Sequence, residues 1–176
     1  DPRILGSTRF GLPLAARRDV LVFQTPPLTE DVAVIGPLVI RLHVSSNCVD
    51  TDFTAKLVDV HPGNRDYPRG FAMNLADGIL RMRYRESWEK PTFMAPGTVH
   101  EIAIEPYATC NLFKAGHRIR VDISSSNFPR YDLNYKTDEP EGEAVRKAIA
   151  TNSVYVDRAR ASHIVLPIVP MAAIIP

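Results

Sequence analysis

Apolar and polar residues alternate at every second position along most of this chain, and no other feature of the sequence limits its fold as strongly. Successive side chains of a strand point to opposite faces of a sheet, so this period predicts strands with one buried face. The 15 prolines are scattered between the alternating stretches, which indicates many short elements rather than long helices. We therefore expect an all-β antiparallel fold, a jelly-roll β-sandwich of roughly seven to nine short strands with at most one short helix.

The alternating stretches mark the strands that we expect. LVIRLHV places Ile40, Leu42 and Val44 on one face. FTAKLVDVHP (53–62) is more apolar on both sides, which suits a central position in the sandwich. The Pro-bounded stretch 27–37 is expected to be a connection, and 140–150 is expected to form the one short helix. The remaining strands are expected within 19–23, 78–87, 99–107, 116–126, 153–157 and 163–169.

Three arginines alternate with large apolar residues in DGILRMRYRES. Arg81, Arg83 and Arg85 would then share one face of a strand, and Glu101 and Glu105 would share a face of the next one. Opposite charges that face each other across two strands contribute roughly 0.2–1 kcal/mol per pair. We interpret the arginines as sheet surface, with an anion or partner site as the alternative.

The charge balance argues against two large classes of partner. The chain of 176 residues carries 21 Lys and Arg against 20 Asp and Glu, a formal net charge of +1. Binding to nucleic acid or to an anionic membrane would require a clear basic excess, so we expect neither partner. No apolar run approaches the roughly 20 residues of a membrane span. We expect one soluble domain, with the cytoplasm slightly favoured.

Cys48 and Cys110 are the two cysteines, and neither has a second Cys or a His at zinc-finger spacing. We expect both to be buried free thiols. A disulfide between them stays open as an alternative, because it requires neighbouring Cα atoms that the sequence does not show.

The sequence contains no catalytic motif, and we expect no catalytic residue. The pentapeptide G-x-S-x-G, which presents the nucleophilic serine of α/β-hydrolases, does not occur. A triad of one serine from 124–126 with His117 and Asp122 is disfavoured, because His117 and an outward-facing Asp122 would lie on opposite faces of one strand. The five histidines form no local ligand pair, so we expect no metal site. No phosphate loop or dinucleotide fingerprint is present, and we expect no cofactor.

Two polar stretches are interpreted as turns. SSSNFPRYDLN (124–134) packs hydroxyl and amide side chains around Pro129. Such side chains bond nearby backbone groups after a strand ends, so a structured corner is predicted, with a direct ligand contact as the alternative. In NCVDTDF (47–53), Asp50 and Asp52 could form a calcium edge, but two carboxylates supply too few oxygens. A turn with an aspartate that caps backbone amides is favoured there.

Five longer phrases occur in order along the chain: DVLVFQTPPL, VSSNCVDTDFTAKLVDVHP, DGILRMRYRES, NLFKAGHRIRVDISSSNFPRYDLN and ASHIVLPIV. Together they resemble the C-terminal domain of the cocaine esterase and X-Pro dipeptidyl-peptidase superfamily of serine hydrolases. The resemblance covers residues 17–169 and is nearest to the branch of cocaine esterase and α-amino acid ester hydrolase. It implies a jelly roll of the galactose-binding-like type beside an α/β-hydrolase domain, which carries the catalytic Ser, Asp and His.

The resemblance implies that this chain is the non-catalytic domain of an ester or amide hydrolase and supports the substrate cleft of a catalytic domain in the same parent chain. The sequence begins with Asp1 rather than Met, so we expect the catalytic domain upstream. We expect a lead-in segment (1–16), the jelly roll (17–170) and a tail (171–176). A free-standing module that binds carbohydrate or another ligand is the alternative function.

Contacts with the missing domain are expected from large aromatic side chains and their polar neighbours. The candidates are Trp88, the single tryptophan, and the corner at Asn127, Phe128 and Arg130. A docking face that is left open would also allow the isolated chain to self-associate.

Overall fold

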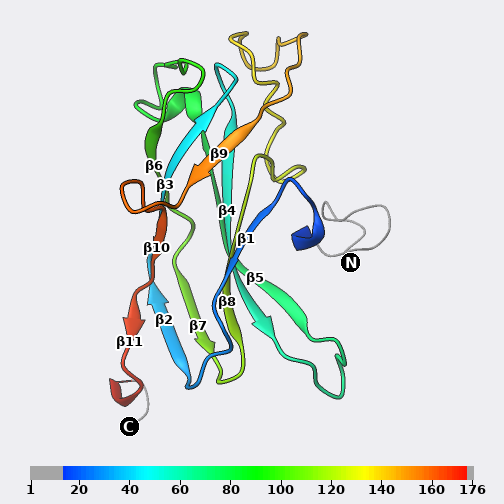
Figure 1. Ribbon diagram of the computed structural model, residues 1–176, viewed down its shortest axis with the longest axis vertical. Helices are drawn as coiled ribbons and strands as arrows, with labels where there is room; N and C mark the ends of the chain where they lie inside the picture. The colour runs from blue at the N-terminus through cyan, green and yellow to red at the C-terminus, as the bar shows by residue number, and fades with distance from the viewer. Residues whose placement is uncertain (1–13, 174–176) are drawn as a thin grey trace.

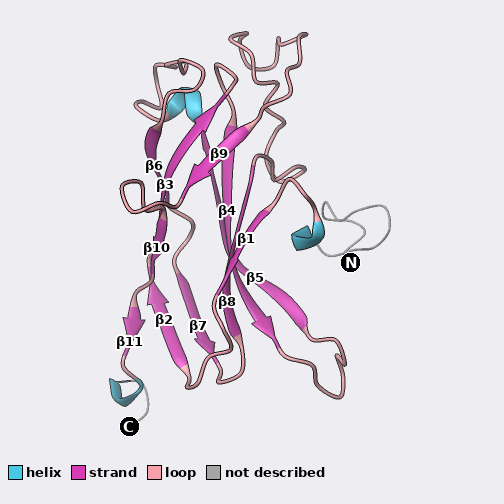
Figure 2. Ribbon diagram, viewed as in Figure 1, coloured by secondary structure: helices cyan, strands magenta, loops and turns pink. Residues whose placement is uncertain are grey.

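Strands make up almost all of the regular structure between residues 14 and 173, the part of the chain that the computed structural model describes (Figures 1 and 2). Within that part there are eleven strands, no α-helix and three short 3-10 helices: η1 (Leu14–Ala16), η2 (Met82–Tyr84) and η3 (Met171–Ala173). No helix between residues 14 and 173 is long and apolar enough to cross a bilayer. The strands are β1 (Leu21–Gln24), β2 (Val32–Gly36), β3 (Val39–Ser46), β4 (Asp52–His61), β5 (Phe71–Arg81), β6 (His100–Ile104), β7 (Thr109–Phe113), β8 (Arg118–Ser124), β9 (Asn152–Tyr155), β10 (His163–Val165) and β11 (Ile168–Val169).

The first layer is a four-stranded antiparallel sheet in the order β1-β8-β4-β5. β4 pairs with β8 on one side and with β5 on the other. Most residues of β4 are buried on both faces of the sheet, which confirms the central position predicted for 53–62. The register of the β4–β5 pair shifts between Leu57 and Val58, a β-bulge or irregularity of the kind that increases the local twist.

The second layer is built from three long antiparallel stretches, and a proline near the middle of each stretch divides it into two strands. β2 continues into β3 across Pro37, β6 into β7 across Pro106, and β10 into β11 across Pro167. We call this line of prolines the crease. Proline has no backbone N–H to donate, so the ladder breaks at each of these positions.

The strand pairing continues on both sides of the crease. Ile40 faces Ile104 in the β3–β6 pair, and Gly36 faces Thr109 in the β2–β7 pair. β10 extends the first of these pieces and β11 the second, while β9 also pairs with β3. The division explains why eleven strands are present where roughly seven to nine were expected.

The core contains two hydrophobic clusters, and both layers contribute to each. The smaller cluster consists of Val34, Leu38, Leu57, Ala76 and Phe113. The larger cluster contains Ile40, Leu42, Val44, Phe53, Ala55, Met82, Met94, Ile102, Ile104, Val121 and Ile123. The alternation in the sequence therefore places the predicted apolar faces between the layers, and the all-β antiparallel sandwich is confirmed.

Two segments differ from the expectation. The stretch 27–37 contains strand β2, because its prolines flank the strand rather than replace it. The helix predicted for 140–150 is wrong: this stretch has only a turn at its start, and Gly142 there has a φ of 79° that a helix does not allow. A hydrogen bond of 3.0 Å from the backbone N of Ala148 to the carbonyl of Tyr135 ties the rest of the segment to the preceding loop.

The jelly-roll topology and the galactose-binding-like type stay predictions, as do the domain boundaries. Of the lead-in segment (1–16) and the tail (171–176), residues 1–13 and 174–176 lie outside the described residues.

His100, at the start of β6, gives a testable pH dependence. Burial, and then the charge of Arg85, lower the pKa of this imidazole. A histidine whose pKa is lower in the folded than in the unfolded state stabilises the fold fully above the unfolded pKa of about 6.5, and this contribution is lost as the pH falls toward the folded pKa. We expect His100→Gln to lose less stability than the parent chain between about pH 7 and pH 5 in urea unfolding. Equal losses in the two proteins would contradict this.

Candidate functional site

Three connections lie at one end of the sandwich, and together we call them the loop end. They join β3 to β4 (47–51), β5 to β6 (82–99) and β8 to β9 (125–151). Because β4 runs antiparallel to both β5 and β8, the start of β4 lies beside the ends of its two neighbours. The three connections are together at the upper end of the molecule in Figure 1.

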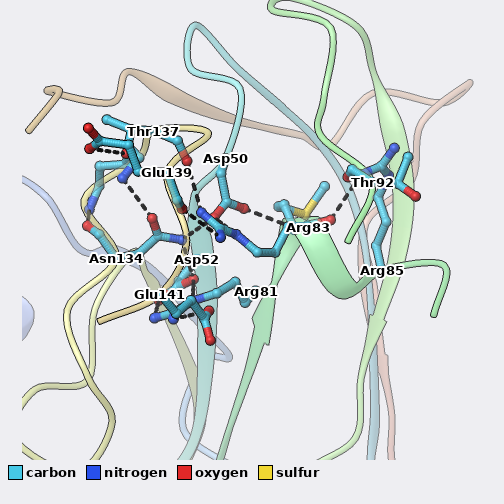
Figure 3. A network of polar contacts seen from close by, with 12 residues as sticks. Asp50, Asp52, Arg81, Arg83, Arg85, Thr92, Asn134, Thr137, Glu139 and Glu141 are labelled. Atoms are coloured by element: carbon cyan, nitrogen blue, oxygen red, sulfur yellow. Dashed lines mark hydrogen bonds and ion pairs between the residues drawn. The ribbon is translucent and has the colours of Figure 1, made fainter. Parts of the chain in front are cut away.

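A buried ion pair joins the first two of these connections (Figure 3). Arg83 Nε donates to Asp50 Oδ2 at 2.7 Å, and the Arg83 backbone N donates to Oδ1 of the same carboxylate at 2.9 Å. The Asp50 side chain is 0% exposed and the Arg83 side chain 7%. The second bond confirms that an aspartate of 47–53 caps a backbone amide.

The same guanidinium holds the third connection. Arg83 Nη2 donates to the carbonyl of Thr137 at 2.8 Å, and Nη1 donates to the carbonyl of Glu139 at 3.0 Å. One side chain thus links all three parts of the loop end, and its donors satisfy backbone oxygens that no strand or helix satisfies.

A second carboxylate–guanidinium pair lies beside the first. Arg81 donates from Nε to Asp52 Oδ1 at 2.9 Å and from Nη2 to Oδ2 at 3.0 Å, a bidentate pair. The hydrogen bonds that Arg81 donates to Asp52 first, and to Glu141, raise the pKa of Arg81 and keep it positively charged. Asn134 Nδ2 donates both to Asp50 Oδ2 at 2.9 Å and to Asp52 Oδ1 at 2.8 Å, so that one amide bridges the two carboxylates.

The interpretation of the three arginines as sheet surface is wrong. β5 ends at Arg81, and η2 then turns the chain so that Arg83 is buried and Arg85 bonds to a carbonyl of its own connection. Carboxylates and carbonyls satisfy these guanidinium groups, which disfavours the alternative of an anion site. Asp50 and Asp52 likewise hold arginines, which disfavours a calcium edge.

A pocket of about 360 Å³ lies beside this network. Its walls include the charged side chains of Arg81 and Glu141 and the less polar ones of Phe128, Leu133 and Tyr135. The pocket therefore has the means to bind a polar group, and none of the serines, cysteines or histidines that most often act as nucleophile and base lines it within the described residues.

The structured corner predicted for 124–134 is confirmed. The backbone N of Phe128 donates to Ser126 Oγ at 3.3 Å, and the backbone N of Arg130 donates to the carbonyl of Asn127 at 2.9 Å. The peptide bond between Phe128 and Pro129 is cis. The serine and asparagine side chains of this corner bond to protein groups, as expected for residues that follow a strand.

The corner folds back onto Asp77 of β5 and Lys56 of β4. Asn127 Nδ2 donates to Asp77 Oδ2 at 2.5 Å, and Asn127 Oδ1 accepts a bond of 2.7 Å from Lys56 Nζ. Arg130 Nη1 pairs with the other oxygen of Asp77. Of the predicted contact residues, Asn127 and Arg130 thus have partners within the chain, whereas the Phe128 ring lies mostly in solvent.

Exposed apolar side chains project from the loop end, and four of them are the most exposed. Trp88, Phe128, Val145 and Ile149 are 76%, 58%, 83% and 91% exposed. The Trp88 ring stacks on the ring of Tyr84, with centroids 6.3 Å apart. Sequence reasoning missed Val145 and Ile149, because they lie in the segment 140–150 that was expected to be a helix. The available signal was the presence of two apolar residues in a charged segment. Whether Trp88 and Phe128 contact another domain stays a prediction.

The structure does not bring the serines at 124–126 to His117. His117 Nδ1 lies 2.9 Å from Asp59 Oδ1. In the β4–β8 register Ser124 faces Thr54. Thr54 is about five positions from Asp59 along β4, roughly 17 Å.

Two expectations about burial are wrong. Asp122, expected on the surface, is buried, and it pairs with Lys56 of the neighbouring strand β4. This burial raises the pKa of Asp122, whereas the charge of Arg120 acts to lower it. Cys48 and Cys110 are both free, but only Cys48 is buried, because Cys110 lies on the outward face of β7.

Comparison with known proteins identifies relatives along almost the whole chain. The family described as "X-Pro dipeptidyl-peptidase C-terminal non-catalytic domain" matches residues 3–165. Cocaine esterase of Rhodococcus sp. (strain MB1 Bresler) is 48% identical over 162 residues, which cover 89% of this chain and 27% of that protein. An α-amino acid ester hydrolase of known structure is 32% identical, with a TM-score of 0.84 over 93% of this chain and 27% of its own. The aminopeptidase of the marine sediment archaeon Thaumarchaeota archaeon is 34% identical, with a TM-score of 0.80 over 89% and 27%.

The matches confirm the resemblance inferred from the five phrases. The chain spans only 27% of the length of each of these three proteins. The structural matches extend over both layers of the sandwich, since they cover 89–93% of the chain. The chain belongs to the family of X-Pro dipeptidyl-peptidase C-terminal non-catalytic domains.

Proposed function

We propose that this chain is the non-catalytic β-sandwich of a serine hydrolase that acts on esters or amides, and that its loop end docks on an α/β-hydrolase domain and supports the substrate cleft. One observation carries the proposal: exposed apolar side chains, led by Trp88, Phe128, Val145 and Ile149, project from connections that a buried ion-pair network holds in place. Exposed apolar groups that cluster at one end of a protein are typical of an interaction surface. Connections that are already ordered lose less conformational freedom on binding.

The relatives support the proposed chemistry of the whole protein. Their names describe two ester hydrolases and an aminopeptidase, that is, enzymes that cleave ester or amide bonds. The reaction that we propose for the parent protein is acyl transfer through a serine acyl-enzyme. The partner domain would supply the serine and its base, and this chain would contribute the wall formed by its loop end.

The alternative function, a free-standing carbohydrate-binding module, has less support. A sugar platform requires aromatic rings on one surface. The rings of Tyr67 and Phe71 are tilted against each other in the β4–β5 hairpin, with centroids 4.8 Å apart, whereas Trp88 lies at the loop end. Arg130 covers the ring of Tyr131 at 5.6 Å. The Tyr67–Phe71 pair and Trp88 therefore lie at different ends of the sandwich.

Two finer points belong to this proposal. A cytoplasmic location is supported by the free, exposed thiol of Cys110, which a reducing compartment preserves. Self-association of the isolated chain is supported by the apolar side chains of the loop end, which have no partner domain to cover them in that state.

Reconstitution with the Rhodococcus relative tests the proposal. A version of that cocaine esterase without the segment that matches this chain is purified and mixed with this chain. Both samples are first heated mildly. We then expect the mixture, but not this chain alone, to react with a fluorophosphonate probe and to hydrolyse p-nitrophenyl esters. Replacing Trp88 with alanine and Ile149 with aspartate should weaken the association by roughly tenfold or more each, because exposed apolar anchors dominate such interfaces. The dissociation constant is measured by analytical ultracentrifugation.

Tyr107 provides the matched control, since it is 76% exposed like Trp88 but lies in the β6–β7 connection, away from the loop end. Tyr107→Ala should leave the dissociation constant unchanged. Labelling of a serine in this chain alone, or a truncated esterase that neither binds this chain nor responds to it, would overturn the proposed function.

A further inference from the structure

A second cluster of functional groups lies at the end of the sandwich opposite the loop end. Asp59 and His61 are at the end of β4, and His117 immediately precedes β8. The antiparallel β4–β8 register brings these ends together, since Val60 faces Arg118. One ligand atom from each of Asp59, His61 and His117 lies within 4.8 Å of the other two.

The spacing of the donor atoms fits a metal ion. His117 Nδ1 is 2.9 Å from Asp59 Oδ1, and His61 Nε2 is 3.4 Å from Asp59 Oδ2. Zinc binds imidazole nitrogen and carboxylate oxygen at about 2.0–2.2 Å in tetrahedral geometry, which places neighbouring ligand atoms roughly 3.3 Å apart. The two separations, which involve different oxygens of Asp59, lie on either side of this value, and all three ligand atoms lie within 4.8 Å of one another. Movements of the side chains toward a common centre would close the site.

One ligand atom has no other role in the fold. His61 Nε2 is buried, and it makes no hydrogen bond within the described residues. Its nearest printed partner is Asp59 Oδ2 at 3.4 Å, too poorly placed for a hydrogen bond, and a buried nitrogen without a hydrogen bond is costly and requires an explanation. The imidazole is held in this orientation by the ring of Phe71, which stacks on it with centroids 4.0 Å apart and planes at 17°.

The surroundings of the carboxylate resemble the outer shell of a metal site. Asp59 is almost completely buried, and Asn111 of β7 donates from Nδ2 to Asp59 Oδ2 at 3.2 Å. Hydrogen bonds of this kind orient the ligands and raise their affinity for the ion. The two imidazoles are partly exposed, which leaves a path for an ion from solvent.

We propose that Asp59, His61 and His117 bind one divalent transition-metal ion of the zinc type. Two imidazole nitrogens and one carboxylate favour such an ion over calcium or magnesium, which prefer oxygen ligands. Binding requires neutral imidazoles, with the remaining hydrogen of His117 on Nε2. The ion cross-links the end of β4 to the start of β8, and solvent completes its coordination. It has no part in the hydrolysis proposed above.

Metal titration of the full 176-residue chain tests the site. The protein carries no polyhistidine tag, and Cys110→Ser removes the exposed thiol next to Asn111. We expect one Zn²⁺ per chain by calorimetry, and visible absorption of bound Co²⁺ at the same stoichiometry. Saturation at about 100 times the dissociation constant should raise Tm by about 5–10 °C.

Substitutions identify the ligands. His61→Ala and His117→Ala should each weaken zinc binding by more than about 100-fold, and Asn111→Ala by roughly 10–100-fold. His163→Ala, which removes an exposed histidine of β10, should leave the affinity unchanged. His61→Gln keeps the size of the side chain and replaces His61→Ala if circular dichroism shows that the alanine variant does not fold. The proposal is wrong if the parent chain shows no saturable binding of one ion, or if the ligand variants bind as tightly as His163→Ala.

Discussion

Replacing Arg83 with methionine is expected to lower the free energy of unfolding by about 3–5 kcal/mol. The substitution keeps much of the side-chain volume but leaves the fully buried carboxylate of Asp50 without its cation. It also removes the two donors that hold the carbonyls of Thr137 and Glu139. Urea unfolding followed by circular dichroism at about neutral pH measures the change.

Two companion variants separate charge from packing. Arg41→Met breaks the exposed pair of Arg41 with Glu101, whose charged atoms are 3.8 Å apart, and should change stability by less than about 0.5 kcal/mol. The double variant Asp50→Asn with Arg83→Met removes both buried charges and should be more stable than Arg83→Met alone. If Arg83→Met costs no more than Arg41→Met, the buried pair does not hold the loop end together.

Replacing Asn134 with aspartate should also lower the free energy of unfolding by about 3–5 kcal/mol at neutral pH. The Nδ2 group that now donates to both Asp50 and Asp52 becomes an oxygen, so that a third carboxylate enters a buried cluster. Like charges raise the pKa of the new carboxyl group above its value in the unfolded chain. Its neutral form is therefore favoured in the fold, and the deficit relative to the parent chain should shrink as the pH falls.

The matched variant Asn134→Ala removes the same two donors without adding charge. It should lower the free energy of unfolding by about 1–3 kcal/mol. Because it adds no carboxyl group, this deficit should lack the pH dependence expected for Asn134→Asp. Limited proteolysis provides a second measurement: Arg146 and Lys147 are already exposed, and release of the 125–151 connection should free their backbone for faster cleavage by trypsin. Equal deficits for both variants at every pH would show that Asn134 does not separate the two carboxylates.

The strands were predictable where their two faces meet different surroundings. In LVIRLHV the apolar positions Ile40, Leu42 and Val44 are all buried, as the alternation requires. The same signal failed in DGILRMRYRES, because alternation does not show where a strand leaves its sheet. Arg81 ends β5, and the next residues form η2, so that a stripe expected on the surface becomes the centre of the polar network.

The two functional regions differ in how much the sequence could show. Trp88 and Phe128 could be named as candidate contacts, which stay a prediction, because large aromatic residues in loops are unusual enough to be noticed; both are exposed. Asp59, His61 and His117 were not identified as a group, because their proximity depends on the register of β4 against β8. Likewise, the partners of Asp50 and Asp52 come from connections that are distant in the sequence and meet only in the folded sandwich.

The crease interrupts the strand pairing of the second layer between the two ends of the sandwich. Each side of it has its own apolar cluster, with Ile164 in contact with both. Segments with separate cores and an interrupted ladder tend to open as separate cooperative units in native-state hydrogen exchange. Strain at one end of the second layer is therefore expected to be taken up at the prolines, while β4 of the first layer runs unbroken between the two ends.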